Sequence, residues 1–318
     1  MRYLIVGLGN IGQKRKAVLG KKCVATVDPN PKANADFLDY KKVPLDLFDS
    51  VVLTIPQQLK NALTEYFLAK GKNVLVEKPL IISQKQGKKF LQIAKKNDAI
   101  WHASYNHRFE PNIVKLKKLL NRKIIGKLYF ARFIYSFGNI KDRINTWRET
   151  EFGVLEEITP HQLDLIFNLL KNTDTNFQTI IARKVESNIF DHWLFTSMDK
   201  KITVECSAIT WKNVFLIEIY GRLGSVHING LRKWNGSELI IRKRTFPSEV
   251  PKEKKIFDQG PDNTWSDDFN YFEKMVRQKQ TSIKNDLQIS LSLANIALNA
   301  NTKKESANKT YRQIQKNS

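Results

Sequence analysis

The chain has little cysteine, no long apolar run and relatively few acidic residues. Cys23 and Cys206 are its only cysteines, and each lies in an apolar stretch, which predicts buried thiols rather than a disulfide. No apolar run reaches the ~20 residues of a membrane helix. The first expected strand starts at residue 2, so no signal peptide is expected. We therefore predict a cytoplasmic protein with no membrane association.

The shortage of acidic residues leaves a formal net charge of +22, from 53 Lys and Arg against 31 Asp and Glu. The basic residues are spread over the chain, on expected helix faces such as 85–96 and 115–123, which is typical of solvated surfaces. No zinc finger, RNA-binding signature or recognition helix is present, so no nucleic-acid partner is expected. The charge would favour anionic ligands such as a dinucleotide or a nucleotide-linked sugar.

The chain does contain a glycine-rich turn near its start. Residues 2–6 are an apolar run typical of a strand buried on both faces of a parallel sheet. A G-x-G-x-x-G sequence follows at 7–12, where a helix begins. Its glycines permit a tight turn, close approach of a pyrophosphate, and close packing of helix on strand, unless they form a plain structural turn. The predicted cofactor-binding residues of this loop are Gly7, Gly9, Asn10, Ile11 and Gly12.

A carboxylate supports the binding hypothesis for this loop. Asp28 ends a second apolar run, 23–27, about 20 residues after Gly7. A carboxylate there accepts both ribose hydroxyls of an adenosine and repels the 2′-phosphate of NADP. We predict NAD as the cofactor, with NADP as the alternative.

Residues 1–103 alternate expected strands and helices, including a helix near 31–39. Five strands with intervening helices predict a doubly wound parallel sheet, a Rossmann-type α/β domain. Gly9, Asp28, Pro56 and Lys78 all fall at the carboxyl ends of strands, where ligands of such sheets gather. That convergence predicts a binding site.

Residues 104–318 are predicted to form a second domain. Alternating β-branched and aromatic residues predict several strands separated by turns, from 127–135 to 238–242, and a terminal helix is expected at about 286–303. His102, His107, His192 and His227 show no metal-ligand spacing with the cysteines or with one another, so no metal site is predicted.

Five segments occur in a characteristic order: GLGNIG at 7–12, TIP at 54–56, GKNVLVEKPL at 71–80, YNHRFEP at 105–111 and GVLEEITPHQLD at 153–164. Together they resemble the Gfo/Idh/MocA oxidoreductases, the relatives of glucose–fructose oxidoreductase and inositol dehydrogenase. The resemblance implies a Rossmann domain followed by an α/β domain with a large, mostly antiparallel open sheet. It implies NAD or NADP, a sugar or polyol substrate, pairing of subunits as a homodimer or homotetramer through the second sheet, and a terminal helix that packs back towards the first domain.

Lys78 follows an expected strand and precedes Pro79. A surface lysine is one interpretation, and an ammonium that stabilises a developing alkoxide is the other. The resemblance favours the second, because the family's EKP lysine has this role, commonly before a cis proline. It also implies cofactor contacts for Thr54, Pro56, Glu77, Lys78 and Asn106, and substrate contacts for Lys78, Asn106, Arg148 and His161.

His161 is the second catalytic candidate. Thr159 is predicted as an N-cap that forms a capping box with Gln162, with Pro160 at the first helical position. His161 then lies in the first turn, where the helix dipole favours a neutral imidazole, as a general base requires. Glu157 would orient the ring, whereas a plain polar histidine is the alternative.

Two residues depart from the commonest family pattern. Glu157 stands where Asp is usual, although Glu occurs in members linked to cell-surface sugar synthesis. Lys60 stands where many members carry His. Asp164 lies three residues after His161, one helical turn on, and is open to a structural interpretation.

The predicted reaction is proton abstraction by His161 from a secondary hydroxyl of a sugar, nucleotide-linked sugar or polyol, with hydride transfer to nicotinamide. Lys78 would stabilise the alkoxide. The alternative is a non-catalytic regulator of the same fold that binds a dinucleotide or a sugar.

Overall fold

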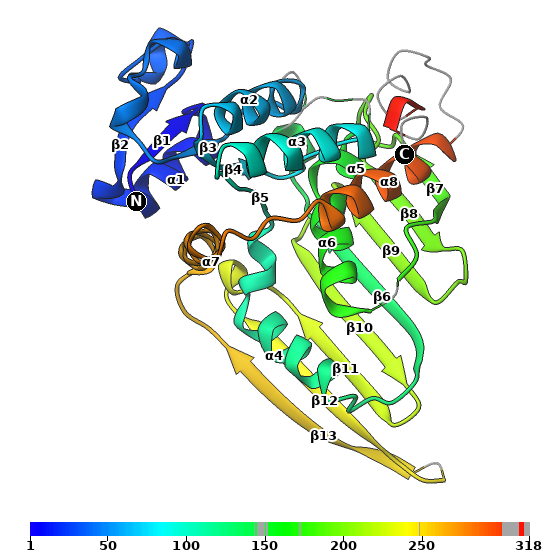
Figure 1. The fold of residues 1–318 in the computed structure, drawn as a ribbon. Helices are drawn as coiled ribbons and strands as arrows, with labels where there is room; N and C mark the ends of the chain where they lie inside the picture. The colour runs from blue at the N-terminus through cyan, green and yellow to red at the C-terminus, as the bar shows by residue number, and fades with distance from the viewer. Residues whose placement is uncertain are drawn as a thin grey trace. The chain divides into compact units, whose positions relative to one another are not determined.

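The computed structural model describes residues 1–142, 144, 150, 152–171, 173–247, 249–300 and 312–314. It divides into two compact units, drawn in Figure 1. Unit 1 comprises Met1–Asn106 and Asn263–Ser290, and unit 2 comprises His107–Asp262 and the described residues from Leu291 onward. No helix within the described ranges is long and apolar enough to cross a membrane.

Unit 1 contains a five-stranded parallel sheet with the strand order β2-β1-β3-β4-β5. The strands are β1 (Tyr3–Val6), β2 (Cys23–Val27), β3 (Ser50–Leu53), β4 (Asn73–Glu77) and β5 (Trp101–Ser104). The connecting helices are α1 (Asn10–Leu19), α2 (Gln57–Ala69) and α3 (Gln84–Lys96). All residues of β1, β3 and β5 are buried, as expected for apolar strands covered on both faces. The predicted doubly wound parallel sheet is confirmed.

The prediction of a helix near 31–39 is wrong. Only a 3₁₀ turn, Pro31–Ala33, forms there, and Asn34 ends it with a left-handed backbone, φ 51°. Asp36 then accepts hydrogen bonds from the backbone N and the hydroxyl of Thr26, at 2.8 and 2.6 Å. These bonds hold the segment in an extended form beside β2, where Phe37 bridges to Val27.

Helix α7 (Thr264–Gln278) belongs to unit 1, although the sequence boundary places it in the second domain. Its Phe269 and Phe272 are buried in the apolar core against Tyr3 and Ile5 of β1. The next helix, α8 (Lys284–Leu298), also begins in unit 1, where its Asp286 accepts a bond from the indole of Trp101 at 3.3 Å. Burial of these side chains against the parallel sheet explains why residues 263–290 group with the first hundred residues.

Unit 2 contains an eight-stranded sheet with the order β13-β12-β11-β10-β6-β9-β8-β7. Only the β6–β9 pair is parallel, which confirms the predicted large, mostly antiparallel sheet. The strands are β6 (Leu128–Ser136), β7 (Phe177–Arg183), β8 (His192–Ser197), β9 (Ile202–Ser207), β10 (Val214–Gly221), β11 (Gly224–Asn229), β12 (Ser237–Thr245) and β13 (Glu249–Asp258). Helices α4 (Pro111–Asn121) and α6 (Thr159–Leu169) lie over one face of the sheet (Figure 1).

The sequence analysis did not predict strand β13. Its sequence EVPKEKKIFD is mostly charged, contains Pro251, and is exposed along most of its length. Charges and proline are tolerated on an edge strand, which pairs on one side only. Register with β12, which places Ile256 opposite Leu239, therefore depends on the neighbouring strand rather than on an alternating pattern within β13.

Candidate active site

The glycine loop of unit 1 has the geometry that its motif predicts. Gly7 has φ +95°, and a Cβ on it would lie 2.5 Å from the carbonyl oxygen of Thr54. A Cβ on Gly12 would lie 2.0 Å from the carbonyl oxygen of Gly7, so helix and strand leave no room for a side chain. A Cβ on Gly9 would meet nothing within 4 Å. The fold therefore leaves no space for a side chain at Gly7 or Gly12. At Gly9 the backbone has free space beside it, which is room for a phosphate.

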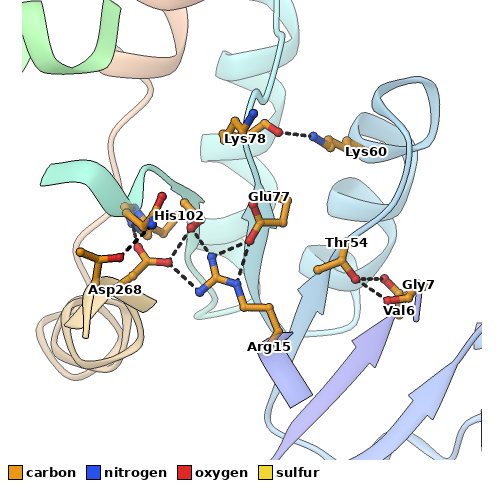
Figure 2. A network of polar contacts seen from close by, with 12 residues as sticks. Val6, Gly7, Arg15, Thr54, Lys60, Glu77, Lys78, His102 and Asp268 are labelled. Atoms are coloured by element: carbon orange, nitrogen blue, oxygen red, sulfur yellow. Dashed lines mark hydrogen bonds and ion pairs between the residues drawn. The ribbon is translucent and has the colours of Figure 1, made fainter. Parts of the chain in front are cut away.

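The start of α1 is suited to bind an anion. Gly9 is its N-cap and carries no capping side chain, and the first turn contains no acidic residue. The first helical bond runs from Gln13 N to Gly9 O at 3.0 Å, so the N–H groups of residues 10–12 precede the helical ladder. Thr54 fixes the loop from β3, since its hydroxyl donates to the carbonyls of Val6 and Gly7 (Figure 2). These features fit the pyrophosphate of a dinucleotide.

Asp28 is fixed at the end of β2. Its Oδ2 accepts a bond from Leu8 N at 2.7 Å, and its Oδ1 accepts one from Asn30 N at 2.9 Å. A carboxylate has about four acceptor positions, so two backbone bonds leave capacity for a ribose diol. The side chain is half-buried and lies beside the glycine loop, which fits its predicted role.

Glu77, predicted to contact the cofactor, is the partner of a buried arginine. Arg15 of α1 donates from Nε to Glu77 Oε1 at 2.7 Å, and its other edge contacts Asp268 of α7 at 2.9 Å (Figure 2). Burial raises the pKa of Asp268, but Arg15 and hydrogen bonds from His102 and Ser104 outweigh it and hold that pKa below its usual value. The sequence analysis missed Arg15 and Asp268 as a pair, since about 250 residues separate them.

Lys78 follows β4 directly, and the Lys78–Pro79 peptide is cis, as the family resemblance implied. Lys60 of α2 lies beside it. The Lys60 side chain is buried, and its Nζ donates to the carbonyls of Lys78 and Pro79 at 3.0 and 2.9 Å. Burial lowers the pKa of Lys60 to about 7.

Two further predicted cofactor residues have clear positions in unit 1. Asn106 is buried and its Nδ2 donates to the hydroxyl of Thr264 at 2.9 Å. Pro56 is the N-cap of α2, directly after β3. Strand ends of one parallel sheet thus bring the glycine loop, Asp28, Thr54 and Glu77–Lys78 to the same edge.

In unit 2, His161 lies in the first turn of α6, with Pro160 preceding it as predicted. The predicted cap is wrong, because the N-cap is Ile158 and Thr159 is already helical. A short helix, α5 (Val154–Glu157), runs almost directly into α6, and the Thr159 hydroxyl donates back to the carbonyl of Val154 at 3.2 Å. Gln162 consequently forms no capping box.

His161 is buried against a second histidine that the sequence analysis did not select. The rings of His161 and His107 are stacked with centroids 4.0 Å apart. Lys233 Nζ lies 3.4 Å from His107 Nε2 and 3.2 Å from the hydroxyl of Tyr135. An ammonium only donates, so a protonated Lys233 requires His107 Nε2 to accept. The motif YNHRFEP contains His107, but nothing in its spacing indicates the stack.

The remaining predicted residues differ in how the structure places them. Asp164 is buried and both of its oxygens accept from Arg108 Nε, at 2.9 and 2.7 Å, which fits its structural interpretation. Glu157 is the last residue of α5, and its orienting role stays a prediction. Arg148 lies outside the described residues. Within the described ranges, no group of three His, Cys, Asp or Glu side chains is arranged to hold a metal ion.

Comparison with known proteins supports this assignment of the first domain. Residues 1–105 match the model of the Gfo/Idh/MocA group, described as an oxidoreductase family with an NAD-binding Rossmann fold. The match covers the first three of the five sequence segments, at 7–12, 54–56 and 71–80.

Several relatives are dehydrogenases by name. The scyllo-inositol 2-dehydrogenase (NADP(+)) IolU of Bacillus subtilis is 31% identical over 103 residues, which cover 32% of this chain and 30% of that protein. The inositol 2-dehydrogenase of Rhizobium meliloti is 26% identical over 205 residues, 60% of this chain and 61% of that protein. The chain therefore aligns with less than two thirds of either relative.

Levoglucosan dehydrogenase, solved as a complex with NADH, has a TM-score of 0.78 to this chain at 16% identity. The match covers 94% of this chain and 96% of that one. At this identity the likeness establishes the fold, which extends over both units.

Proposed function

We propose that this chain of the Gfo/Idh/MocA oxidoreductase family is an NAD-dependent dehydrogenase that oxidises a secondary hydroxyl of a sugar, nucleotide-linked sugar or polyol. The observation that carries the proposal is the set of groups at one edge of the parallel sheet. An open phosphate-binding turn, a fixed ribose-binding carboxylate and a lysine at the end of β4 lie there, on three different strands. Such a set is typical of a dinucleotide enzyme rather than of a structural sheet.

Each residue would have a definite task in the reaction. The turn at 7–12 and Asp28 would hold the dinucleotide, whose nicotinamide supplies the hydride acceptor when bound. His161 would accept the proton of the substrate hydroxyl at a ring nitrogen. Lys78 would stabilise the negative charge that develops on that oxygen. Glu157, Asn106 and Arg148 are proposed to orient the base, the cofactor and the substrate.

The surroundings of His161 favour a neutral base. Its position in the first turn of α6, at the helix N-terminus, disfavours an imidazolium. A neutral imidazole is the form that accepts a proton from an alcohol.

The names of the relatives define the first substrates to test. Purified protein would be mixed with NAD or NADP and with myo-inositol, scyllo-inositol, levoglucosan or a UDP-linked amino sugar, and absorbance of the reduced nicotinamide followed. We expect turnover with NAD on at least one polyol or sugar. If NADH binds but no sugar or polyol is oxidised and no carbonyl product is reduced, the non-catalytic regulator becomes the correct interpretation.

A further inference from the structure

Lys60 is a charged side chain that is almost completely buried in unit 1, with 3% of its surface exposed. A buried ammonium is costly, and the fold retains it only where its hydrogen bonds are satisfied. Lys60 Nζ donates to two backbone carbonyls, those of Lys78 and Pro79. The two carbonyls lie just beyond the end of β4, where the ladder of the sheet supplies no donor.

The same face of α2 carries two other polar residues that contact this segment. Gln57, Lys60 and Asn61 follow i, i+3, i+4 spacing, which places them on one side of a helix. Asn61 Nδ2 donates to the carbonyl of Ile81 at 3.0 Å. Gln57, with its amide oriented to satisfy both neighbours, donates to the carbonyl of Pro79 and accepts from Ile81 N. One helical face therefore holds the backbone of residues 78–81.

An uncharged donor would satisfy the same carbonyls at a lower desolvation cost. The fold nevertheless places a cation there, beside a second cation, Lys78, whose charge disfavours the protonated form of Lys60. Glu77, which is held by Arg15, supplies the nearby negative charge (Figure 2).

We propose that Lys60 is a positioning residue for Lys78: it fixes the backbone from which the Lys78 side chain projects. The inference rests on the proposed function, because the reaction is what requires a fixed ammonium. A preset position matters for catalysis, since a displacement of about 1 Å costs up to about 100-fold in rate.

The test uses three variants of the full chain. Lys60→Met keeps the length and packing of the side chain but removes the donors and the charge. Lys60→Arg keeps donors and charge. Lys72→Met is the matched control, because Lys72 is a half-buried lysine of unit 1 whose Nζ also donates to a backbone carbonyl, that of Phe48 at 2.8 Å. Thermal unfolding and NADH titration establish that each variant is folded and binds the cofactor.

We expect Lys60→Met to lower kcat roughly 10- to 100-fold, with the Kd for NADH changed by less than about threefold. Lys60→Arg should recover most of the lost rate, and Lys72→Met should behave like the wild type. A merely structural role of Lys60 would lower stability and cofactor affinity together, or would be satisfied by Met rather than by Arg. Either result would overturn the proposal.

A second readout does not require turnover. The reactivity of Lys78 towards an amine-directed reagent would be measured against pH by mass spectrometry of the labelled peptide. Release of the backbone at residues 78–81 should change the labelling rate of Lys78 in Lys60→Met, and leave it unchanged in Lys60→Arg and Lys72→Met. Equal labelling rates in wild type and Lys60→Met would refute the inference even if no substrate is found. Full activity of Lys78→Ala would instead refute the proposed role of Lys78, whatever Lys60 does.

Discussion

The two units place their functional residues in different ways. In unit 1 the candidate residues follow the ends of parallel strands, and the backbone itself brings them to one edge. In unit 2 His161 stands at the start of a helix, and its surroundings come from side chains of other elements, such as His107 and Tyr135. The first arrangement depends on topology and the second on side-chain packing. Substitutions should therefore affect the two units differently.

The largest effect is expected in unit 2. His161→Asn keeps the size and polarity of the side chain but removes the base, so kcat should fall ~100- to 10,000-fold. NADH affinity and thermal stability should be close to those of the wild type. The acidic limb of the pH–rate profile should disappear with the base. If that limb persists in His161→Asn, another group accepts the proton.

Glu157→Gln is the matched variant for that experiment. It keeps the shape of the side chain and loses only its charge, so its effect on kcat should be smaller than that of His161→Asn. An equal loss would place Glu157 directly in the proton transfer.

The corresponding change in unit 1 is Lys78→Ala. Removal of one preorganised charge donor should lower kcat by roughly 100-fold or more, because the alkoxide loses its stabilising ammonium. The dinucleotide is bound mainly by the turn at 7–12, so the Kd for NADH should change only a few-fold. Activity within a few-fold of the wild type would make Lys78 an ordinary lysine at a strand end.

A stability measurement tests the effect of burying Lys60 separately from its effect on catalysis. Burial lowers the pKa of Lys60 to about 7, whereas an unfolded lysine titrates near ~10.4. Between these values the unfolded chain binds more protons at residue 60 than the folded chain, so the stability of the wild type rises with pH. Relative to Lys60→Met, urea unfolding should therefore show the wild type gaining roughly 3 to 4 kcal/mol from pH 7 to pH 10. If the unfolding free energies of the two proteins change equally with pH, burial does not lower the pKa of Lys60.

The smallest effect is expected for cofactor choice. Asp28→Ala removes a charged acceptor for the ribose hydroxyls, so NAD affinity should fall roughly 10-fold while NADP affinity falls less. Asp36→Ala is the control, because Asp36 also accepts a bond from a backbone N–H of this region, that of Thr26 in β2. Tighter binding of NADP than of NAD by the wild type would contradict the predicted preference.

The positions of most helices and strands were predictable because each carries a local signal. Residues 111–121 show the helical period and begin with a proline, and α4 has these bounds in the structure. The charged strand β13 and the extended segment near Phe37 were not predictable in this way. Both owe their conformation to a neighbouring strand, β12 in one case and β2 in the other.

The sequence by itself determined the parallel sheet, the glycine turn, and the places of Asp28 and Lys78 at strand ends. These depend on residues close in the chain and on the rule that parallel strands end at a common edge. Only the tertiary structure decided that Arg15 binds Asp268, that α7 completes the core of unit 1, and that His107 stacks on His161. Contacts between distant residues depend on how whole elements pack, and no short pattern encodes that packing. For Lys60, the sequence predicted that it lies on a helix. Only the tertiary structure showed that it is buried against the carbonyls of Lys78 and Pro79.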